Sequence, residues 1–355
     1  MTVEEARAQF PVLEKIAYLN AGTFGPVSRA TYEAVSTELE RDYREGRSGG
    51  PNFARVMELR DELRGRIAGL VGAEPLQVAL TTSTTDGCNI VLGGLGLGPD
   101  DEIVTTAEEH FGLLGALATS GARIVVVAPD AEAIRAAVTP RTRLLALSQV
   151  IWTTGRILPV LELRAETGIP VLVDGAQSVG AIPVSAAGLD YLTVSGQKWL
   201  CGPDGTGALV VGDPEGLAVS APSYFSQTAY EPDGRFEPKP GAARFDTGWW
   251  PASSLSGLLA ALDGRPSWAF DHAASAAERC RQLLEDRVEV VGPPETERST
   301  LVAFRPATPP AETVVALHAA NVHVREIPNA GLVRVSCGWW TSDDDLDRLL
   351  AALPR

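Results

Sequence analysis

The chain has 355 residues, of which 45% are hydrophobic and 21% charged, a composition typical of globular proteins and unlike that of disordered or fibrous chains. Its formal net charge of −15 argues against a partner such as nucleic acid or an anionic membrane, because polyanions would be repelled at long range. This length predicts a large domain and a smaller one.

The first ten residues and the cysteines bear on where the chain works. Glu4, Glu5 and Arg7 follow one another closely and no apolar segment accompanies them, so neither a signal peptide nor a membrane span is predicted, and we expect a cytoplasmic protein. The four cysteines show no C-x-x-C spacing. We expect them to be reduced, buried thiols and expect no metal site.

Between residues 71 and 211, short apolar runs alternate with amphipathic stretches, which is typical of an α/β fold around a mostly parallel sheet. Several runs are apolar on both faces, so helices should cover both sides of the sheet. Helices are expected between the strands, for example at 132–137 and 161–167. The predicted strands are 78–81, 102–105, 123–127, 144–148, 171–174, 191–195 and 208–211.

The alternation stops at residues 214–243, which are rich in proline, glycine and aromatic residues and predict a long loop. A helical stretch from 253 to 288 follows, interrupted at Gly264 and Pro266. A smaller α/β unit then begins, with strands near 301–304 and 332–336 and a last helix at 343–353. Thr341 is expected to cap that helix, with Asp344 completing a capping box.

The strongest chemical signal is Lys198, which follows the strand 191–195 and precedes a glycine-rich turn. A lysine there can be exposed at the sheet edge, and partial burial beside a cofactor lowers its pKa towards the range that Schiff-base chemistry needs. An ordinary surface lysine is the alternative, because a lysine followed by glycine four residues later is a common pattern.

Asp174 ends the apolar strand 171–174, at the carboxyl edge where ligands bind in open α/β sheets. A carboxylate at this place suits a pyridinium nitrogen, which must stay protonated if the ring is to act as an electron sink. A helix-capping role is the alternative for this aspartate.

Two further segments also follow predicted strands. Residues 81–85 carry hydroxyls at the start of a helix, which predicts an anion site suited to phosphate, although simple N-capping explains them equally. His110 follows the strand 102–105, where an imidazole can stack on a flat ring and move protons, or simply pack as a neutral side chain.

Together these residues resemble the class V aminotransferase family, also called cysteine desulfurase-like, of fold-type I pyridoxal-phosphate (PLP) enzymes. The resemblance covers nearly the whole chain and includes the opening segment 18–22, the helix near 64–73, the segment 139–144, the spacing from Asp174 to Lys198 and the turn at 202–203. It implies a mostly parallel seven-stranded PLP domain at 16–250. A small α/β domain at 251–355 would pack with the N-terminal segment 1–15.

The resemblance also implies roles for individual residues. Lys198 would form the Schiff base with PLP, Asp174 would pair with the ring nitrogen, His110 would stack on the ring and act in catalysis, and Gln177 would lie near its phenolic oxygen. Thr84, Thr85, Ser195 and Gln197 would hold the phosphate, with Gln197 in place of a common histidine. Arg334 would grip the substrate carboxylate, with structural ion pairing as its alternative, and the substrate would be bordered by Asn20, Ala21 and Trp152.

The reaction is not decided by family, because one electron sink serves several reactions of amino acids. Desulfurases that resemble this chain carry a cysteine shortly before the carboxylate-binding arginine, and residues 322–330 hold none. Cys337 follows Arg334 on a predicted strand, a poor place for a mobile nucleophile. A true desulfurase is therefore disfavoured.

Two other departures concern aromatic residues. Trp249 stands where a threonine of relatives reaches the phosphate of the partner subunit, which puts that contact in doubt, although Thr247 could supply a hydroxyl. Trp152 replaces a frequent polar residue, and with Trp249, Trp250, Trp339 and Trp340 it indicates an aromatic substrate pocket or simply core packing.

The leading hypothesis is a C–S β-lyase acting on cysteine or an S-substituted cysteine, since this reaction needs no thiol on the protein. An aminotransferase is the second hypothesis and an amino-acid epimerase or racemase the third. A PLP-binding protein without catalysis is disfavoured by the presence of both Lys198 and Asp174. A homodimer is implied by the resemblance alone.

Overall fold

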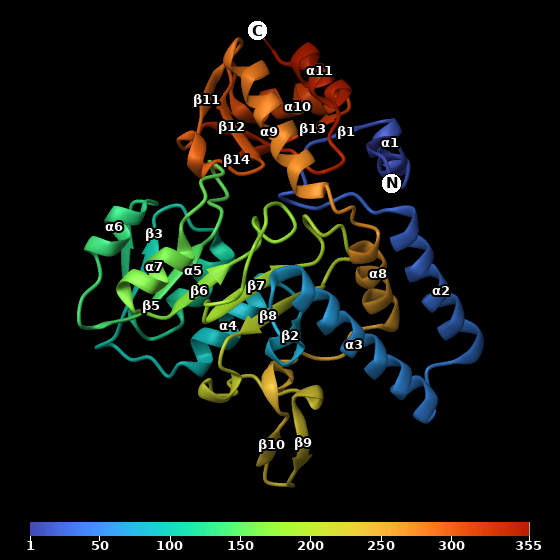
Figure 1. Cartoon of the computed structure of the whole chain (residues 1–355), viewed down its shortest axis with the longest axis vertical. Helices are drawn as coiled ribbons and strands as arrows, with labels where there is room; N and C mark the ends of the chain where they lie inside the picture. Colours follow the sequence, from blue (N-terminus) through green and yellow to red (C-terminus); the bar gives the residue numbers. More distant parts are fainter. Residues whose placement is uncertain (355) are drawn as a thin grey trace.

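The computed structural model describes residues 1–354 and is built around a seven-stranded sheet (Figure 1). Its strand order is β2-β8-β7-β6-β5-β3-β4. Only β8 runs against its neighbours, so the sheet is mostly parallel, as the sequence predicted. The strands are β2 (Val78–Thr81), β3 (Glu102–Thr106), β4 (Arg123–Val127), β5 (Thr142–Ser148), β6 (Val171–Asp174), β7 (Tyr191–Ser195) and β8 (Gly207–Val211).

The two faces of this sheet are both buried, and the alternation of side chains along the strands explains how. On β6, Val171 and Val173 enter one core while Leu172 enters the other. The first core is covered by α3 (Gly49–Val71), α6 (Ala131–Ala136), α7 (Val160–Thr167) and α8 (Ala252–Asp263), and the second by α4 (Thr84–Gly94) and α5 (Phe111–Ala118). The predicted double helical layer is thus present.

The carboxyl ends of the parallel strands share one edge of the sheet. Ser148, Asp174 and Ser195 end three adjacent strands there. Thr81 ends β2 on the same edge, and the chain enters α4 two residues later, where the side chain of Ser83 caps the helix. The residues with predicted chemistry are therefore gathered by topology.

The small domain is a four-stranded antiparallel sheet in the order β11-β12-β15-β14, and Figure 1 shows it above the large sheet, in orange and red. Three helices pack with it, α9 (Ala269–Glu285), α10 (Pro310–Ala319) and α11 (Asp343–Ala352). The strands are β11 (Glu289–Val291), β12 (Leu301–Arg305), β14 (Arg325–Ile327) and β15 (Leu332–Ser336).

The N-terminal segment lies against the small domain. Strand β1 (Ala17–Tyr18) pairs in parallel with β13 (Val322–His323), and α1 (Val3–Arg7) is tied to α11 by an ion pair of 2.6 Å between Arg7 and Asp345. The ring of Phe10 packs edge-on against Trp339 at 5.3 Å between centroids. These contacts join the N-terminal segment to the small domain.

Three details differ from the sequence-based expectations. Helix α8 packs on α2 (Arg29–Glu45) and α3, and its leucines belong to the large core, so it lies with the large sheet although the expected boundary at 251 precedes it. The expected loop at 214–243 contains a hairpin of β9 (Gln227–Tyr230) and β10 (Phe236–Pro238), which projects at the bottom of Figure 1.

The third difference is the cap of α11. The prediction of Thr341 is wrong, because Ser342 is the N-cap and forms the capping box with Asp345. The hydroxyl of Thr341 instead accepts a hydrogen bond of 3.0 Å from the backbone N–H of Gly338, one turn earlier. The cap therefore falls one residue later than predicted.

Candidate active site

A cavity of about 200 Å³ opens at the carboxyl edge of the large sheet. The ends of β5, β6 and β7 and the start of α4 form its walls. All eight residues predicted to bind the cofactor line it, together with Trp152, and the walls are completed by Ser83, Ser148 and Ala176. The cofactor set proposed from sequence is thus brought together by the fold.

Lys198 stands in the cavity on the turn after β7. Burial lowers the pKa of its ammonium group to about 8, the nearby Asp174 partly opposes that shift, and the positive charges of Arg334 and Arg325 add to it. With this pKa about a tenth of the amine is uncharged at pH 7 and about half at pH 8, and the uncharged form is the one that a nucleophile or a base requires.

The Lys198 turn is held by its neighbours. The carbonyl oxygen of Lys198 accepts a hydrogen bond from the N–H of Cys201, whose φ of 58° is unusual for a residue with a side chain. Gly25 donates from its N–H to the carbonyl of Gln197, and a Cβ on Gly25 would stand 2.1 Å from the carbonyl oxygen of Lys198. Only glycine fits at this close approach.

Asp174 and Gln177 occupy the cavity from the end of β6. The Oδ1 atom of Asp174 accepts a hydrogen bond of 2.9 Å from the N–H of Ala176, which orients this buried carboxylate. The amide of Gln177 donates to the carbonyl of Gly22 at 2.8 Å and accepts from the indole of Trp199 at 3.0 Å. Gln177 therefore links the cavity to the N-terminal segment and keeps one amide hydrogen for a ligand.

The opposite end of the cavity suits an anion. Thr84 and Thr85 form the first turn of α4, where backbone N–H groups lack partners within the helix. The hydroxyl of Ser195 donates to the Oε1 atom of Gln197 at 3.0 Å, which leaves the Nε2 hydrogens of Gln197 available as donors. Asp86 does not oppose an anion here, because its carboxylate is turned back to accept from the N–H and the hydroxyl of Thr82 at 3.0 Å.

His110 and Trp152 meet at the mouth of the site. His110 is the N-cap of α5, and its Nδ1 atom accepts a hydrogen bond of 3.1 Å from the N–H of Gly112, so the neutral imidazole carries its hydrogen on Nε2. Burial and the charge of Lys198 lower the pKa of His110, which favours this neutral form. The indole of Trp152 stands edge-on to the imidazole, with 5.3 Å between centroids.

Arg334 lies beside the cavity on β15, with 1% of its surface exposed. Its Nη1 atom donates to the carbonyl of Trp152 at 2.7 Å, and its Nε has no hydrogen-bond partner among residues 1–354. Burial and the charge of Arg325 lower the pKa of Arg334 to about 9, so it remains a cation at neutral pH. Such a buried, incompletely paired guanidinium calls for a negatively charged ligand.

The predicted substrate residues of the opening segment stand next to this guanidinium. A Cβ on Gly22 would lie 2.5 Å from Nη2 of Arg334, so glycine is needed directly after Asn20 and Ala21. The hydroxyl of Thr23 donates to the side chain of Asn20 at 2.8 Å. Asn20 and Ala21 directly precede this glycine, and neither is among the residues that line the cavity.

Arg325 was missed from sequence. It pairs directly opposite Arg334 across β14 and β15 and donates to the hydroxyl of Thr23 at 3.1 Å. Within residues 1–354, the hydrogen bonds of both arginines go to uncharged oxygens. The sequence shows an arginine in the segment 322–330, but this arginine reaches Arg334 only because β14 pairs with β15.

Glu109 and Ser148 were also missed. The carboxylate of Glu109 accepts from the N–H of Ser148 at 3.1 Å and from the hydroxyls of Ser148 and Thr106, and burial raises the pKa of Glu109 to about 7. Ser148 lines the cavity and lies opposite Asp174 in the register of β5 and β6. Glu109 follows β3 and Ser148 ends β5, so the sequence already placed both residues at the carboxyl ends of strands.

These groups fit PLP. A buried amine suits the aldehyde, an oriented carboxylate suits the ring nitrogen, and the turn at α4 with the amide of Gln197 suits a phosphate. The Aminotransferase class-V family model matches residues 17–349. The chain belongs to the class V aminotransferase family.

Relatives of this class V enzyme carry out different reactions. It is 30% identical to an isopenicillin N epimerase of Streptomyces clavuligerus over 99% of this chain and 97% of the relative. It is also 30% identical to a probable cysteine desulfurase of Pseudomonas aeruginosa, covering 98% and 97% of the two chains.

Among solved structures, the fold is similar to that of C-DES, described as a cystine C–S lyase. A complex of C-DES with its product cysteine persulfide has a TM-score of 0.88, with 26% identity and coverage of 97% and 98%. A lysine-to-alanine variant of C-DES with glycine covalently linked to the PLP cofactor has a TM-score of 0.89, with 27% identity. The class V enzyme therefore has a fold-type I architecture and depends on PLP. Each helix within residues 1–354 is too short or too polar to cross a bilayer.

Proposed function

We propose that this class V enzyme is a C–S β-lyase that acts on cysteine or an S-substituted cysteine. The observation that carries the proposal is that a buried amine on Lys198 lies near a buried guanidinium on Arg334, in a site whose lining residues include no cysteine. These groups suit an amino acid, and the reaction requires no protein thiol to accept sulfur.

The cysteines of the chain support a lyase over a desulfurase. All four are buried. The segment between β13 and β15 folds as a strand and a tight turn, with positive φ angles at Asn329 and Gly331, so it forms no long mobile loop above the site. Desulfurases of this family need a thiolate that reaches the substrate sulfur, and this segment offers neither the residue nor the reach.

The residues of the chain would act as follows. Arg334 binds the α-carboxylate of the substrate, and its contact with Trp152 fixes the guanidinium beside the aromatic wall. The uncharged amine of Lys198, once free, takes the proton from the α-carbon. With PLP bound, Asp174 would hold the protonated ring nitrogen and His110 would pack on the ring; their own contacts, with the N–H groups of Ala176 and Gly112, orient both side chains.

PLP, when bound, supplies the electron sink for the carbanion at the α-carbon. The bond between Cβ and sulfur then breaks with its electrons passing to sulfur, which leaves as a thiolate. The remaining enamine takes up water and gives pyruvate and ammonium. For cystine the sulfur product would be cysteine persulfide, so no external oxidant or reductant is needed.

Arg325 favours a substrate with a second acidic group. It lies opposite Arg334, and its charge is felt by Lys198, by His110 and by Arg334 itself. Within residues 1–354 these two neighbouring cations form no hydrogen bond with a carboxylate, so together they match a substrate with two anionic groups better than a substrate with one. Cystine carries two carboxylates, whereas S-methylcysteine carries one, so we propose cystine as the preferred member of the class.

Epimerisation is the alternative that the relatives favour, since an isopenicillin N epimerase matches over nearly the full length. It would use the same α-proton removal followed by return of a proton to the other face. An aminotransferase remains the second alternative, and it would return the proton to the cofactor and need a 2-oxo acid as amino acceptor.

We also propose a homodimer. Phe53, Phe225 and Trp249 form an aromatic cluster in which Phe53 is 41% and Trp249 53% exposed, with centroids 5.1 Å apart for Phe225 and Trp249. Exposed aromatic clusters of this kind are typical of protein interfaces. Trp249 is the residue that replaces the expected phosphate-binding threonine, so a partner would meet this cluster near that segment.

The direct test is product analysis of the holoenzyme with cystine, cysteine and S-methylcysteine, each with and without a 2-oxo acid. The lyase predicts pyruvate, ammonium and a thiol or persulfide without the 2-oxo acid, with cystine turned over fastest. Product that appears only when the 2-oxo acid is added would establish an aminotransferase. Loss of optical activity without pyruvate would establish an epimerase.

A further inference from the structure

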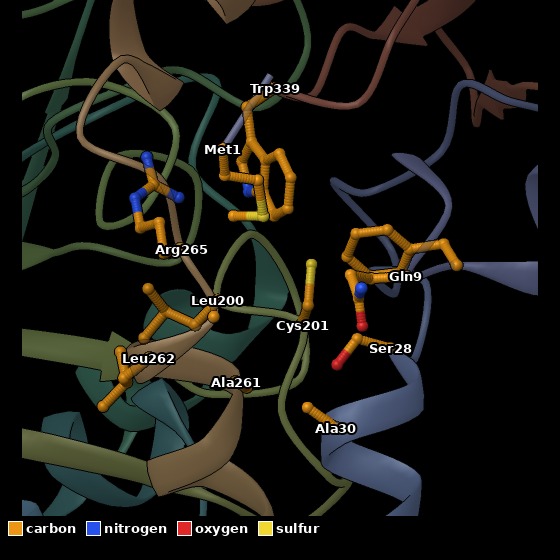
Figure 2. Close-up of a pocket in the computed structure, with 12 residues that line it drawn as sticks. Met1, Gln9, Ser28, Ala30, Leu200, Cys201, Ala261, Leu262, Arg265 and Trp339 are labelled. Atoms are coloured by element: carbon orange, nitrogen blue, oxygen red, sulfur yellow. The ribbon is translucent and has the colours of Figure 1, made fainter. Parts of the chain in front are cut away.

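A second cavity lies behind the Lys198 turn, and no part of the proposed reaction uses it. Its volume is about 110 Å³, and its walls come from the N-terminal segment, the start of α2, the turn after Lys198, the end of α8 and Trp339 (Figure 2). We call it the Arg265 cavity and define it by Phe10, Leu200, Cys201, Arg265 and Trp339. It shares none of these residues with the PLP cavity.

The walls of the Arg265 cavity are mostly apolar. Phe10, Leu200, Cys201 and Trp339 are each at most 5% exposed. Figure 2 shows the indole of Trp339 above the opening and the thiol of Cys201 pointing up into it, with Leu200 and Leu262 on one side and Ala30 below. Burial raises the pKa of Cys201 to about 12, so this thiol is uncharged and belongs to the apolar lining.

One strong charge interrupts this apolar wall. The Nη1 and Nη2 atoms of Arg265 are buried and have no hydrogen-bond partner among residues 1–354. Figure 2 shows the guanidinium turned towards the side of the cavity where Met1 and Trp339 lie. Its pKa is lowered to about 10 by burial, so Arg265 is still a cation at neutral pH.

Within residues 1–354, the contacts of Arg265 offset little of the cost of burying its charge. Its guanidinium carbon lies 4.3 Å from the ring centroid of Phe270, a contact that leaves the two terminal nitrogens without acceptors. A buried, unpaired guanidinium is costly, and a carboxylate can accept from both terminal nitrogens at once. The cavity therefore presents an apolar wall beside a site for one carboxylate.

The size of the cavity limits the ligand. A dry protein cavity of roughly 150 Å³ binds benzene, so a space of this kind takes an alkyl chain of about three to five carbons. We propose that the Arg265 cavity binds a small aliphatic carboxylic acid, with its carboxylate on Arg265 and its chain against Leu200, Cys201 and Trp339.

The site lies where the two domains and the Lys198 turn meet. Arg265 lies in the short link between α8, which packs with the large sheet, and α9, which packs with the small one. Cys201 donates from its N–H to the carbonyl of Lys198. A bound acid would therefore touch both the link between domains and the turn that carries Lys198.

The test is calorimetric titration of the PLP-loaded enzyme with sodium pentanoate, with pentan-1-ol and pentylamine as ligands of the same chain length. Pentanoate is expected to bind with saturable heat, and the neutral and cationic analogues about tenfold or more weakly. Absence of saturable heat for pentanoate at tens of millimolar, or equal binding of the alcohol, would overturn the proposal.

Variants locate the binding. Arg265→Gln is expected to weaken pentanoate about tenfold or more, whereas Arg66→Gln, at a half-exposed arginine of α3, should leave its affinity unchanged. Ala261→Leu fills the cavity and keeps Arg265, so it should also abolish binding, and it protects the test if Arg265→Gln folds poorly. If Arg334→Gln removes the binding and Arg265→Gln does not, the acid occupies the substrate site and the proposal is wrong.

Discussion

Two fully buried arginines, Arg60 on α3 and Arg334 on β15, differ in what surrounds their charge. Arg60 donates to the carboxylate of Asp246 at 2.8 Å, a group it shares with Arg64, and its guanidinium lies over the ring of Phe225. Among residues 1–354, the hydrogen bond of Arg334 goes only to the carbonyl of Trp152. Burial is therefore common to both, and the lack of a counter-charge within residues 1–354 distinguishes the proposed ligand site from the structural cluster.

Lys198 gives the largest expected effect, because its amine is both the proposed attachment point for PLP and the proposed base. Lys198→Ala should remove the visible absorbance of the lysine-bound cofactor and lower turnover by about 10³-fold or more. Absorbance spectra and pyruvate release measure the two effects. Lys239→Ala, at a lysine outside the cavity, is the control and should change neither. An unchanged visible band in Lys198→Ala would place the attachment elsewhere.

The structural role of the Arg60 cluster is tested by a substitution of Asp246. Asp246→Asn leaves the buried guanidiniums of Arg60 and Arg64 without their counter-charge and should cost about 3–5 kcal/mol in the free energy of unfolding. The matched control is Asp263→Asn, which removes a surface ion pair with Arg66 and should cost less than about 1 kcal/mol. Urea unfolding of both variants gives the difference, and equal stability losses would contradict the assignment.

For Arg334 we expect the opposite result, a loss of activity with little loss of stability. Arg334→Gln removes the proposed carboxylate anchor and should lower kcat/KM about 30-fold or more, mainly by raising KM, while the free energy of unfolding changes little or rises. Steady-state kinetics with cystine and urea unfolding measure both quantities. A variant that unfolds easily but keeps its KM would show that Arg334 is structural like Arg60.

Arg325 should have a smaller and substrate-dependent effect. Arg325→Gln is expected to lower kcat/KM about tenfold for cystine and to leave S-methylcysteine unchanged, because only cystine has a second carboxylate. The ratio of the two kcat/KM values is the measurement. An equal loss for both substrates would mean that Arg325 supports Arg334 or the fold instead of choosing the substrate.

The smallest effect concerns pH. With a pKa of about 8, Lys198 gains its uncharged form as the pH rises through that value, so the rate at which the PLP-free enzyme captures PLP should rise about tenfold between roughly pH 7 and 9 and then level off. Stopped-flow absorbance measures this rate. A rate that keeps rising towards pH 10.5 would mean that burial does not lower the pKa of Lys198.

Much of the large domain followed from local patterns. Apolar runs without alternation marked the strands because helices cover both faces, and residues 171–174 and 191–195 were predicted with their observed bounds. Since parallel strands end at one edge, residues directly after them had to converge, which is why Asp174, Lys198 and the threonines of α4 could be placed together. The resemblance to the family supplied the chemistry.

The remaining features depend on distant contacts. Arg325 reaches the site only because β14 pairs with β15, and the Arg265 cavity forms where the N-terminal segment, α8 and Trp339 meet. The helix of residues 252–263 lies with the large sheet because it packs on α2 and α3, contacts that its own sequence does not show. At α11, two adjacent hydroxyls each precede an aspartate by three residues, so only the backbone path selects Ser342 over Thr341.

The most direct test of the lyase is a proton NMR time course of the holoenzyme with L-cystine in deuterated water, without any 2-oxo acid. A lyase predicts loss of the cystine signals with the appearance of pyruvate, and a matched sample of Lys198→Ala should stay unchanged. Loss of the α-proton signal alone, with the β-protons of cystine retained and no pyruvate formed, would contradict the lyase and leave an epimerase.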